Sequence, residues 1–455
     1  MKYHFKLQPS RRHFLTTLGA GALGTTAALP SFGATTPSYM KVVVIGGGMA
    51  GATVAKYLRL WSNKTVDVTI IEPSATYVSN IMSNLVVTGQ YLPSILNFNW
   101  NTLKSSYGVK VVQGTVKGVV ASGSGWNVSV NGSGTTYYAD RVVVAPGIDF
   151  HPVYDDNDRP VDVLHAWKAG PQTTQLNSLL TQLTSTSTVV MTIPSAPYRC
   201  PPGPYERACV IADYLQRNKP GAKIIVLDAN LSVTAEKENF TKAFTLYPNL
   251  QYLSGHRLKF ITPAGGVTTA GSVTVDRLAS DSSVLDQKTF SGNLLNIIPP
   301  QKAGQIAQTL GLCDASGFAP VDGLSFESTI SGKKGIHIIG DASKTSLPKA
   351  GHVGNQGAKI CADAILRAFT GNAPYATPTA NSACFSPISN TMASWLTAVY
   401  QYENVANTYT GTPWNYIARD LPAGTTGPTE ASGPSTGNFS KMYTWYKTLM
   451  TETYA

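Results

Sequence analysis

The sequence predicts an α/β protein with two Rossmann-like domains and a smaller α+β domain at the C-terminus. Three observations lead to this prediction. Within residues 41–73 a buried strand runs into a glycine-rich turn, a helix and a second strand, which is how a doubly wound fold begins. Residues 188–228 repeat the strand–helix–strand pattern, and beyond residue 372 the chain is rich in Pro, Thr, Tyr and Asn and loses that alternation.

The glycine-rich turn has the spacing of a dinucleotide-binding loop. A run of Val and Ile suited to a buried parallel strand precedes it directly. Gly46 permits the tight turn, Gly48 lets the backbone approach a pyrophosphate, and Gly51 lets the next helix pack closely on the strand. That helix begins with Met49 and Ala50, so its N-terminus faces the phosphate charge.

A second strand over residues 66–71 ends at Glu72, about twenty residues after the glycines. A carboxylate at this place accepts hydrogen bonds from the ribose hydroxyls of the AMP half of a dinucleotide. The alternative is a glycine-rich turn in an ordinary α/β domain. Strand, glycines, helix, strand and acid in this order favour the ADP end of a dinucleotide.

Two further strand ends indicate which dinucleotide binds. One predicted strand ends in Ala145 and Gly147, and another, over residues 335–342, ends in Gly340 and Asp341. Flavoproteins with two dinucleotide domains carry both features, the second placing an aspartate on the ribityl chain of FAD. Dehydrogenases that use only NAD do not need it. We therefore expect FAD.

Residues 1–36 read as a twin-arginine leader. Arg11 and Arg12 precede a mildly apolar run that begins at Phe14, and small residues near Ala34 offer a cleavage site. The run is too short and too rich in Gly and Thr for a membrane span. Twin-arginine export carries proteins that are already folded around a cofactor, so the sequence predicts a periplasmic protein.

The charge and the cysteine pattern argue against several classes of protein. The formal net charge is +10, and removal of the leader leaves about +6 with no arginine-rich block, so we expect no nucleic-acid partner. The five cysteines form no C-x-x-C or C-x-x-C-H motif, and the seven histidines have no metal-ligand spacing with them. We expect neither haem attachment nor a metal site.

The second Rossmann-like domain lacks a nucleotide loop. Residues 188–193 read as its first strand, but the glycine-rich turn that should follow is replaced by several prolines with Tyr198 and Arg199. Prolines remove amide donors and the two large side chains occupy the space of a second pyrophosphate. The sequence therefore predicts that NAD(P)H is not used.

Six stretches together resemble the flavoprotein subunit of flavocytochrome c sulfide dehydrogenase, over nearly the whole mature chain. Of these, RCPPGPYERA is specific, whereas the glycine motif alone fits many families. The resemblance implies a glutathione-reductase-like fold and a periplasmic FAD enzyme that oxidises sulfide and passes electrons to a c-type cytochrome subunit. The stretches are VVVIGGGMAGATVAKYL, HAWKAGPQT, RCPPGPYERA, PVDGLSFEST, KGIHIIGDAS and LPKAGHVGN.

Two departures from the family pattern bear on the chemistry. Family members often attach FAD through a cysteine, and Asn80 stands at the aligned place, so we expect FAD to be bound non-covalently. The family also has a redox disulfide beside the flavin; Cys200 matches its first cysteine and Ala319 stands at the second. Cys313 is the nearest thiol to that position. It is either a partner for Cys200 or a buried residue of a helix that begins at Gln305.

The candidate catalytic residues are thus Cys200 and Cys313. Lys349 and the helix that begins at Gly351 would stabilise negative charge on the reduced flavin, although Lys349 could equally be a solvated loop residue. The expected cofactor-binding residues lie in the glycine turn, at strand ends or at the start of that helix: Gly46, Gly48, Met49, Ala50, Gly51, Glu72, Asn80, Val116, Ala145, Gly147, Gly340, Asp341, Lys349 and Gly351.

The function expected from these features is FAD-dependent oxidation of sulfide, or of a related reduced sulfur compound, with a c-type cytochrome as acceptor. A sulfide:quinone reductase is the nearest alternative, and a catalytically idle FAD-binding accessory protein of a sulfur-oxidising assembly is another. In the C-terminal domain, residues 392–402 and 439–450 are expected to be helices. The expected divisions are a leader (1–36), a split FAD domain (37–152 and 287–371), a second Rossmann-like domain (153–286) and a domain covering the flavin (372–455).

Overall fold

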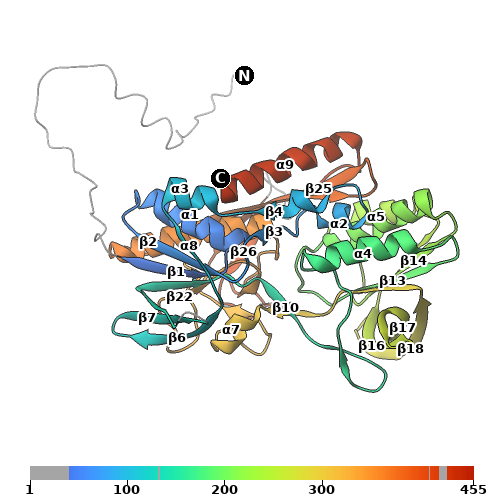
Figure 1. Ribbon diagram of the computed structural model, residues 1–455, viewed down its shortest axis with the longest axis horizontal. Coiled ribbons are helices and arrows are strands. Elements are labelled where there is room, and N and C mark those ends of the chain that lie inside the picture. The colour runs from blue at the N-terminus through green and yellow to red at the C-terminus, as the bar shows by residue number, and fades with distance from the viewer. Residues whose placement is uncertain (1–39, 132–133, 409, 420–427) are drawn as a thin grey trace, which may run out of the picture. The chain divides into compact units, whose positions relative to one another are not determined.

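The computed structural model describes residues 40–131, 134–408, 410–419 and 428–455. The predicted twin-arginine leader lies outside these residues. The described residues form one compact unit (Figure 1). No helix among the described residues is long and apolar enough to cross a membrane.

A five-stranded parallel sheet forms the first Rossmann-like domain, as predicted, in the order β22-β9-β1-β2-β5. Helix α1 (Met49–Trp61) follows β1 directly and packs along α8 (Gly351–Phe369), as Figure 1 shows. The strands read as short apolar runs because both faces of this sheet are covered. They are β1 (Lys41–Ile45), β2 (Asp67–Glu72), β5 (Lys110–Gln113), β9 (Arg141–Val144) and β22 (Ile336–Ile338).

The second Rossmann-like domain is also confirmed, with the parallel order β15-β14-β13-β19. Its elements are β13 (Thr188–Ile193), α5 (Gly203–Asn218), β14 (Lys223–Asp228), α6 (Lys237–Phe244), β15 (Leu250–Leu253), β19 (Leu294–Ile297) and the preceding α4 (Pro171–Gln182). Because β19 pairs with β13, this sheet extends beyond the boundary expected at residue 286. An antiparallel sheet lies beside it: β16 (His256–Ala264), β17 (Val267–Leu278) and β18 (Val284–Gly292).

The C-terminal domain differs from its prediction in one element. Residues 392–402 were expected to be helical, but β25 (Ala393–Glu403) is a strand that pairs with β24 (Thr379–Pro387) and β26 (Asn415–Arg419). The segment is rich in aromatic and β-branched residues and is paired on both sides, which favours a strand. Helix α9 (Thr436–Tyr454) confirms the second expected helix and extends it at both ends.

The remaining elements are short or connect the sheets. Between β2 and β9 lie β3 (Tyr77–Val78), α2 (Ser83–Val87), η1 (Pro93–Leu96), β4 (Asn97–Phe98), α3 (Asn101–Tyr107), β6 (Val116–Ser122), β7 (Gly125–Val130) and β8 (Thr136–Ala139). The others are β10 (Ile148–Phe150), β11 (Val153–Tyr154), β12 (Pro160–Val161), β20 (Gln301–Ala303), α7 (Gln305–Thr309), β21 (Ala319–Pro320), η2 (Gly340–Ala342), β23 (Ser343–Lys344) and β27 (Thr429–Glu430).

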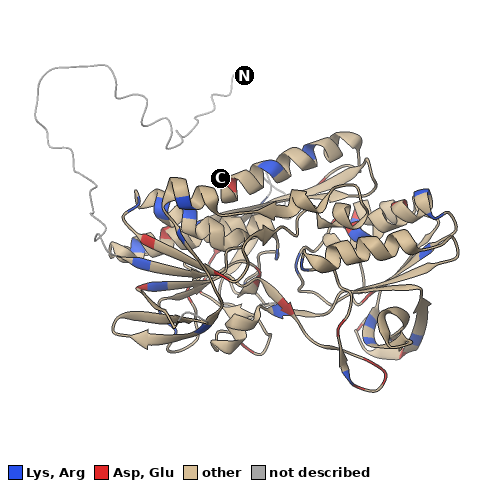
Figure 2. Ribbon diagram, in the orientation of Figure 1, with Lys and Arg blue, Asp and Glu red and all other residues tan. Residues whose placement is uncertain are grey.

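Charged residues are sparse along these elements, and basic and acidic positions are scattered among them (Figure 2). The described ion pairs include neighbouring-strand contacts such as Lys110 with Asp67 at 3.2 Å and Arg257 with Asp276 at 3.2 Å. Exposed pairs of this kind contribute little. The fold is therefore stabilised mainly by the apolar core around the two parallel sheets.

Candidate active site

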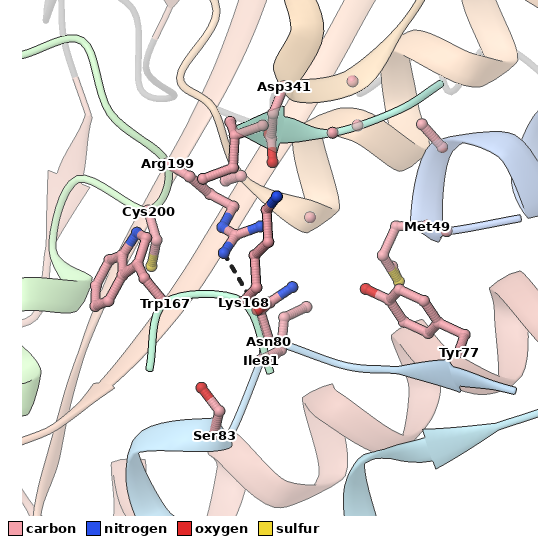
Figure 3. Close-up of a pocket in the computed structure, with 18 of the residues that line it drawn as sticks. Met49, Tyr77, Asn80, Ile81, Ser83, Trp167, Lys168, Arg199, Cys200 and Asp341 are labelled. Carbon is pink, nitrogen blue, oxygen red and sulfur yellow. Dashed lines mark hydrogen bonds between the residues drawn. The ribbon is translucent and has the colours of Figure 1, made fainter. Parts of the chain in front are cut away.

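A cavity of about 480 Å³ lies at the carboxyl ends of the strands of the first sheet. Ligands of open α/β sheets bind at this edge, and the volume suits a small-molecule site. Its wall includes the glycine turn after β1, the start of α8, the loop between β13 and α5, strand β24 and one residue of α9. Figure 3 shows side chains from several of these segments pointing into it.

The glycine turn is held in a shape that only glycine adopts. Gly46 has φ +100°, and its amide donates to Ile71 O at 2.9 Å. A Cβ there would lie 2.5 Å from the Ala145 carbonyl oxygen, and a Cβ at Gly51 would lie 1.9 Å from Gly46 O. No side chain of the described chain caps the N-terminus of α1. Its first amide groups therefore face the cavity, as an anion site requires.

Glu72, at the end of β2, lies beside this turn. Its Oε2 accepts from Gly47 N at 2.8 Å and its Oε1 from Ser74 N at 2.9 Å. A carboxylate has about four acceptor positions, so two remain for ribose hydroxyls. The sequence prediction for this residue fits the geometry.

Asp341 lies in the 3₁₀ turn after β22 and also lines the cavity. Burial raises its pKa, and the positive charges of Arg199 and Lys349 oppose that rise. The α8 N-terminus follows in the chain, and Gly351 there leaves room for Ile81, whose Cδ1 would lie 2.9 Å from an added Cβ. Two features favourable to a flavin, a half-buried acid and a helix N-terminus, thus share one wall.

Lys349 lies behind the cavity wall, adjacent to Asp341. Its ammonium donates to the carbonyl oxygens of Asp341 and Ser343, at 2.9 Å each, and lies 3.8 Å from the centroid of the Phe318 ring. Burial lowers its pKa to about 8. The alternative of a solvated loop lysine is therefore wrong, and Lys349 supports the Asp341 turn without lining the cavity.

The structure brings most of the predicted cofactor residues together. Asn80 from the loop after β3 joins them, and its Oδ1 accepts from Ala169 N at 2.7 Å and from Arg199 Nη2 at 3.2 Å. Gly51 and Lys349 pack behind the wall instead. The predicted residues on the wall are Gly46, Gly48, Met49, Ala50, Glu72, Asn80, Val116, Ala145, Gly147, Cys200, Gly340, Asp341 and Gly351.

Cys200 lies in the loop between β13 and α5 with φ +59°, unusual for a residue with a side chain. Its amide donates to Lys349 O at 2.6 Å, and its carbonyl accepts from Gly203 N at 2.8 Å. A Cβ at Gly203 would lie 2.8 Å from the Cys200 sulfur, so this glycine lets the thiol approach the start of α5. Burial raises the pKa of the thiol well above its usual value, while Arg199 and the Gly203 amide oppose the rise.

Cys313 is not where the sequence suggested. Helix α7 ends at Thr309, so Cys313 lies in the following loop, half-buried against the core and off the cavity wall. Burial raises its pKa to about 11. The structure therefore does not bring it to the same wall as Cys200. Ala319, at the position of the second family cysteine, is fully buried in β21.

A buried polar cluster beneath Cys200 was not predicted. Asn84 donates to Glu206 Oε1 at 2.8 Å and accepts from Arg207 Nε at 2.8 Å. Arg207 also donates to the carbonyl oxygens of His165 and Ala166. Burial raises the pKa of Glu206 to about 8 and lowers that of Arg207 to about 9. Glu206 and Arg207 both belong to the stretch RCPPGPYERA, so this stretch was the sequence signal from which the cluster could have been predicted.

The acid at the end of a strand of the second Rossmann-like sheet is hydrogen-bonded within the protein. Asp228, at the end of β14, stands where such domains hold an acid for ribose. Its Oδ2 accepts from the hydroxyls of Tyr205, at 2.9 Å, and Tyr252, at 2.7 Å. The Asp228 carboxylate is therefore already hydrogen-bonded to protein hydroxyls, and the absence of NAD(P)H use stays a prediction.

The first cavity fits FAD on an independent observation. Trp167 and Trp445 line the wall, and their indole N–H groups are buried with no hydrogen-bond partner in the described part of the chain. Such donors require an acceptor. A flavin carries carbonyl and ring-nitrogen acceptors, and the glycine turn accommodates its pyrophosphate.

Comparison with known proteins agrees with this geometry. Residues 173–299 match the family described as the central part of the sulfide dehydrogenase [flavocytochrome c] flavoprotein chain, and residues 40–164 match pyridine nucleotide-disulphide oxidoreductases. The sulfide dehydrogenase [flavocytochrome c] flavoprotein chain of Chlorobaculum thiosulfatiphilum is 46% identical over 46 residues, which are 10% of this chain and 94% of that sequence.

Solved structures share the fold at low identity. The sulfide:quinone oxidoreductase of Aquifex aeolicus has a TM-score of 0.67 at 14% identity, with 91% of each chain covered. An NAD-dependent persulfide reductase from A. fulgidus has a TM-score of 0.58 at 15% identity, covering 91% of this chain and 77% of that one. With the relative and the cofactor cavity taken together, this chain belongs to the flavocytochrome c sulfide dehydrogenase flavoprotein family of FAD-dependent oxidoreductases.

Proposed function

We propose that this protein oxidises sulfide, or a related reduced sulfur compound, and passes the electrons to a c-type cytochrome. One observation carries the proposal: Cys200 presents a thiol to the same cavity as the glycine turn and Asp341. Sulfide oxidation needs a group that accepts the electron pair of HS⁻, and an oxidised cysteine sulfur beside a two-electron acceptor can be that group.

The residues of the first sheet would hold FAD along the cavity. The turn at Gly46 and the N-terminus of α1 would bind the pyrophosphate, Glu72 the ribose, and Asp341 the ribityl chain. The α8 N-terminus would favour negative charge on the flavin. FAD supplies two-electron acceptance from the substrate and one-electron transfer to the next carrier.

We infer that FAD is bound without a covalent link. Asn80 stands at the family attachment position, and its side-chain oxygen is occupied by Ala169 and Arg199. An amide offers no thioether chemistry. Acid precipitation of the purified protein should therefore leave all of the flavin in the supernatant, and flavin retained in the pellet would contradict this inference.

Cys200 would handle the sulfur atom. The thiolate is the reactive form of a cysteine, and a helix N-terminus and a nearby arginine both favour it. The start of α5 and Arg199 provide these two influences against the cost of burial. The half-buried position of the thiol limits access to small nucleophiles, which suits a substrate of the size of HS⁻.

The location and the acceptor are parts of the same proposal. Arg11 and Arg12 suggest twin-arginine export to the periplasm, and the relative from Chlorobaculum is named as a chain of a flavocytochrome c. A c-type cytochrome should therefore reoxidise the reduced protein faster than a water-soluble quinone does. Faster reoxidation by the quinone would favour a sulfide:quinone reductase.

Anaerobic titration of the FAD-loaded protein with sodium sulfide tests the proposal. The wild-type flavin should lose its visible absorbance, Cys200→Ser should stay oxidised, and Cys361→Ala, which removes a buried thiol away from the cavity, should match the wild type. If sulfide leaves the wild-type flavin oxidised, the protein is an FAD-binding accessory protein and the proposed activity is wrong.

A further inference from the structure

Two of the five cysteines line the cavity, and the second of them is Cys384. Cys200 comes from the loop between β13 and α5, and Cys384 from the middle of β24. Both residues are half-buried and both line the cavity. Cys209 and Cys361 are fully buried within helices and Cys313 lies off the wall.

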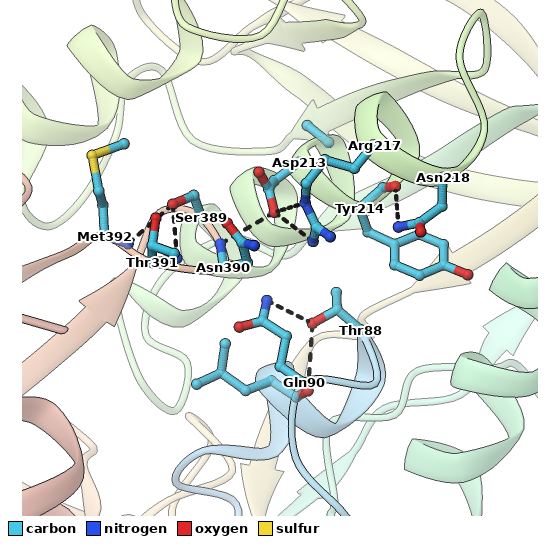
Figure 4. Close-up of polar contacts among 12 residues, drawn as sticks. Thr88, Gln90, Asp213, Tyr214, Arg217, Asn218, Ser389, Asn390, Thr391 and Met392 are labelled. Carbon is cyan, nitrogen blue, oxygen red and sulfur yellow. Dashed lines mark hydrogen bonds and ion pairs between the residues drawn. The ribbon is translucent and has the colours of Figure 1, made fainter. Parts of the chain in front are cut away.

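The segments that carry the two thiols are fastened together. Helix α5 packs against β24. At its far end Asp213 accepts from the amide of Asn390, in the turn that follows β24, and from Arg217, as Figure 4 shows. The hydroxyl of Tyr247 donates to Ile388 O at 2.6 Å in the same turn. These contacts hold β24 in place against the helix whose first turn faces Cys200.

The pKa of the Cys200 thiol also depends on Cys384. After burial, the Cys384 thiol is the largest of the influences that raise the pKa of Cys200, ahead of the carboxyl of Glu206. The interaction between charges falls with distance. Cys384 and Glu206 both act on the Cys200 thiol, in agreement with the place of all three residues on the same cavity wall.

We propose that Cys200 and Cys384 form the reversible disulfide of this protein, with Cys384 serving in place of the family cysteine that Ala319 replaces. The pair deepens the proposed function and rests on it for its substrate. The geometry points to this pair because both thiols line one cavity on segments that are packed together. Cys313 does not meet that condition.

The first step of the reaction between such a disulfide and sulfide needs no further oxidant or reductant. HS⁻ attacks one sulfur of the disulfide, a new S–S bond forms, the old one breaks, and the second cysteine leaves as a thiolate. A second HS⁻ then removes the outer sulfur as HSSH and leaves two thiolates. Closing the disulfide again removes two electrons, which a two-electron acceptor of the flavin class takes up.

Peptide mapping of the purified, FAD-loaded protein tests the pair directly, because trypsin places each cysteine on its own peptide. Cys200 falls on residues 200–207, Cys209 on 208–217, Cys313 on 303–333, Cys361 on 360–367 and Cys384 on 368–419. The protein is oxidised with diamide, which accepts the two electrons and two protons. Remaining thiols are blocked with iodoacetamide, and the digest is analysed without reduction.

We expect a single linked species that joins peptides 200–207 and 368–419. Two of the five cysteines should therefore escape iodoacetamide and become available for labelling only after reduction. Cys384→Ser should abolish the link, and Cys361→Ala should retain it. A link between 200–207 and 303–333, or no intramolecular link in the wild type, overturns the proposal. Because the wild type itself gives the decisive result, a misfolded variant does not obscure it.

The same samples separate this proposal from the proposed function. If sulfide bleaches the flavin but the linked peptide is absent, the pair is wrong and the sulfide activity stands. If the linked peptide forms but sulfide leaves the flavin oxidised, the pair stands and the sulfide activity is wrong. Cys384→Ser should slow bleaching by at least tenfold while the FAD content remains that of the wild type.

Discussion

Replacement of Gly46 by alanine should weaken the binding of FAD to the protein. The backbone at Gly46 has φ +100°, which costs a residue with a Cβ about 1–3 kcal/mol. The new Cβ would lie 2.5 Å from the Ala145 carbonyl oxygen, and overpacking of this kind costs about 1–3 kcal/mol more. The turn has little freedom to move, because Gly46 N donates to Ile71 O at 2.9 Å and Ala145 N to Ile45 O at 2.8 Å.

The turn relieves this strain only by rotating its amides away from the cavity. If 2 kcal/mol of the strain appears in binding, the dissociation constant of FAD rises about thirty-fold. The assay is the ratio of flavin to protein after desalting, followed by calorimetric titration of apoprotein with FAD. Gly123→Ala is the matched control: its φ of +58° costs about 1 kcal/mol, but nothing lies within 4 Å of the added Cβ. Gly46→Ala protein with a wild-type affinity for FAD would refute the assignment of the glycine turn to the pyrophosphate.

Three further predictions follow from buried polar contacts. Tyr205→Phe removes a donor from the buried Asp228 and should lower the free energy of unfolding in urea by about 1–3 kcal/mol, without allowing NADH to reduce the flavin; an unchanged stability would contradict the assigned contact. Burial raises the pKa of Glu206 to about 8, so the stabilising contribution of its protonated carboxyl is complete below about pH 4.5 and is lost as the pH rises towards 8. Across that window the free energy of unfolding of Glu206→Gln should rise relative to that of the wild type by up to about 1.4 kcal/mol per pH unit. Parallel curves of unfolding free energy against pH for the two proteins would contradict the raised pKa. Asn80→Ala leaves the Ala169 amide unpaired and should lower the melting temperature, whereas Asn80→Asp, which keeps an acceptor, should not lower it as far.

The sequence was sufficient for the parts of the fold that depend on local signals. The strand before Gly46, the acid at Glu72 and the strand end at Asp341 each lie within a few residues of an apolar run and a turn, so pattern alone placed them. Parallel strands must then align their carboxyl ends, which brings these residues to one cavity. The first half of the site follows from this rule.

The C-terminal strands, the position of Cys384 and the contacts of Lys349 depend instead on segments that are distant in the sequence. Residues 392–402 looked helical, but pairing with β24 and β26 makes them a strand. That strand pairing also fixes β24 against the cavity, which is why Cys384 lies there and why its position was not readable from its neighbours. The role of Lys349 stayed open for the same reason, since its partner carbonyls and Phe318 come together only in the folded chain.

The central claim is that sulfide delivers its sulfur to Cys200. The most direct test is the mass of the tryptic peptide 200–207 after the FAD-loaded protein has reacted with one equivalent of sulfide under anaerobic conditions and been alkylated. We predict that this peptide gains the mass of one sulfur atom, and that the gain is lost on reduction before alkylation. If the extra sulfur appears only on peptide 303–333 or 368–419, or on none, while the flavin is still reduced, Cys200 is not the residue that receives the substrate.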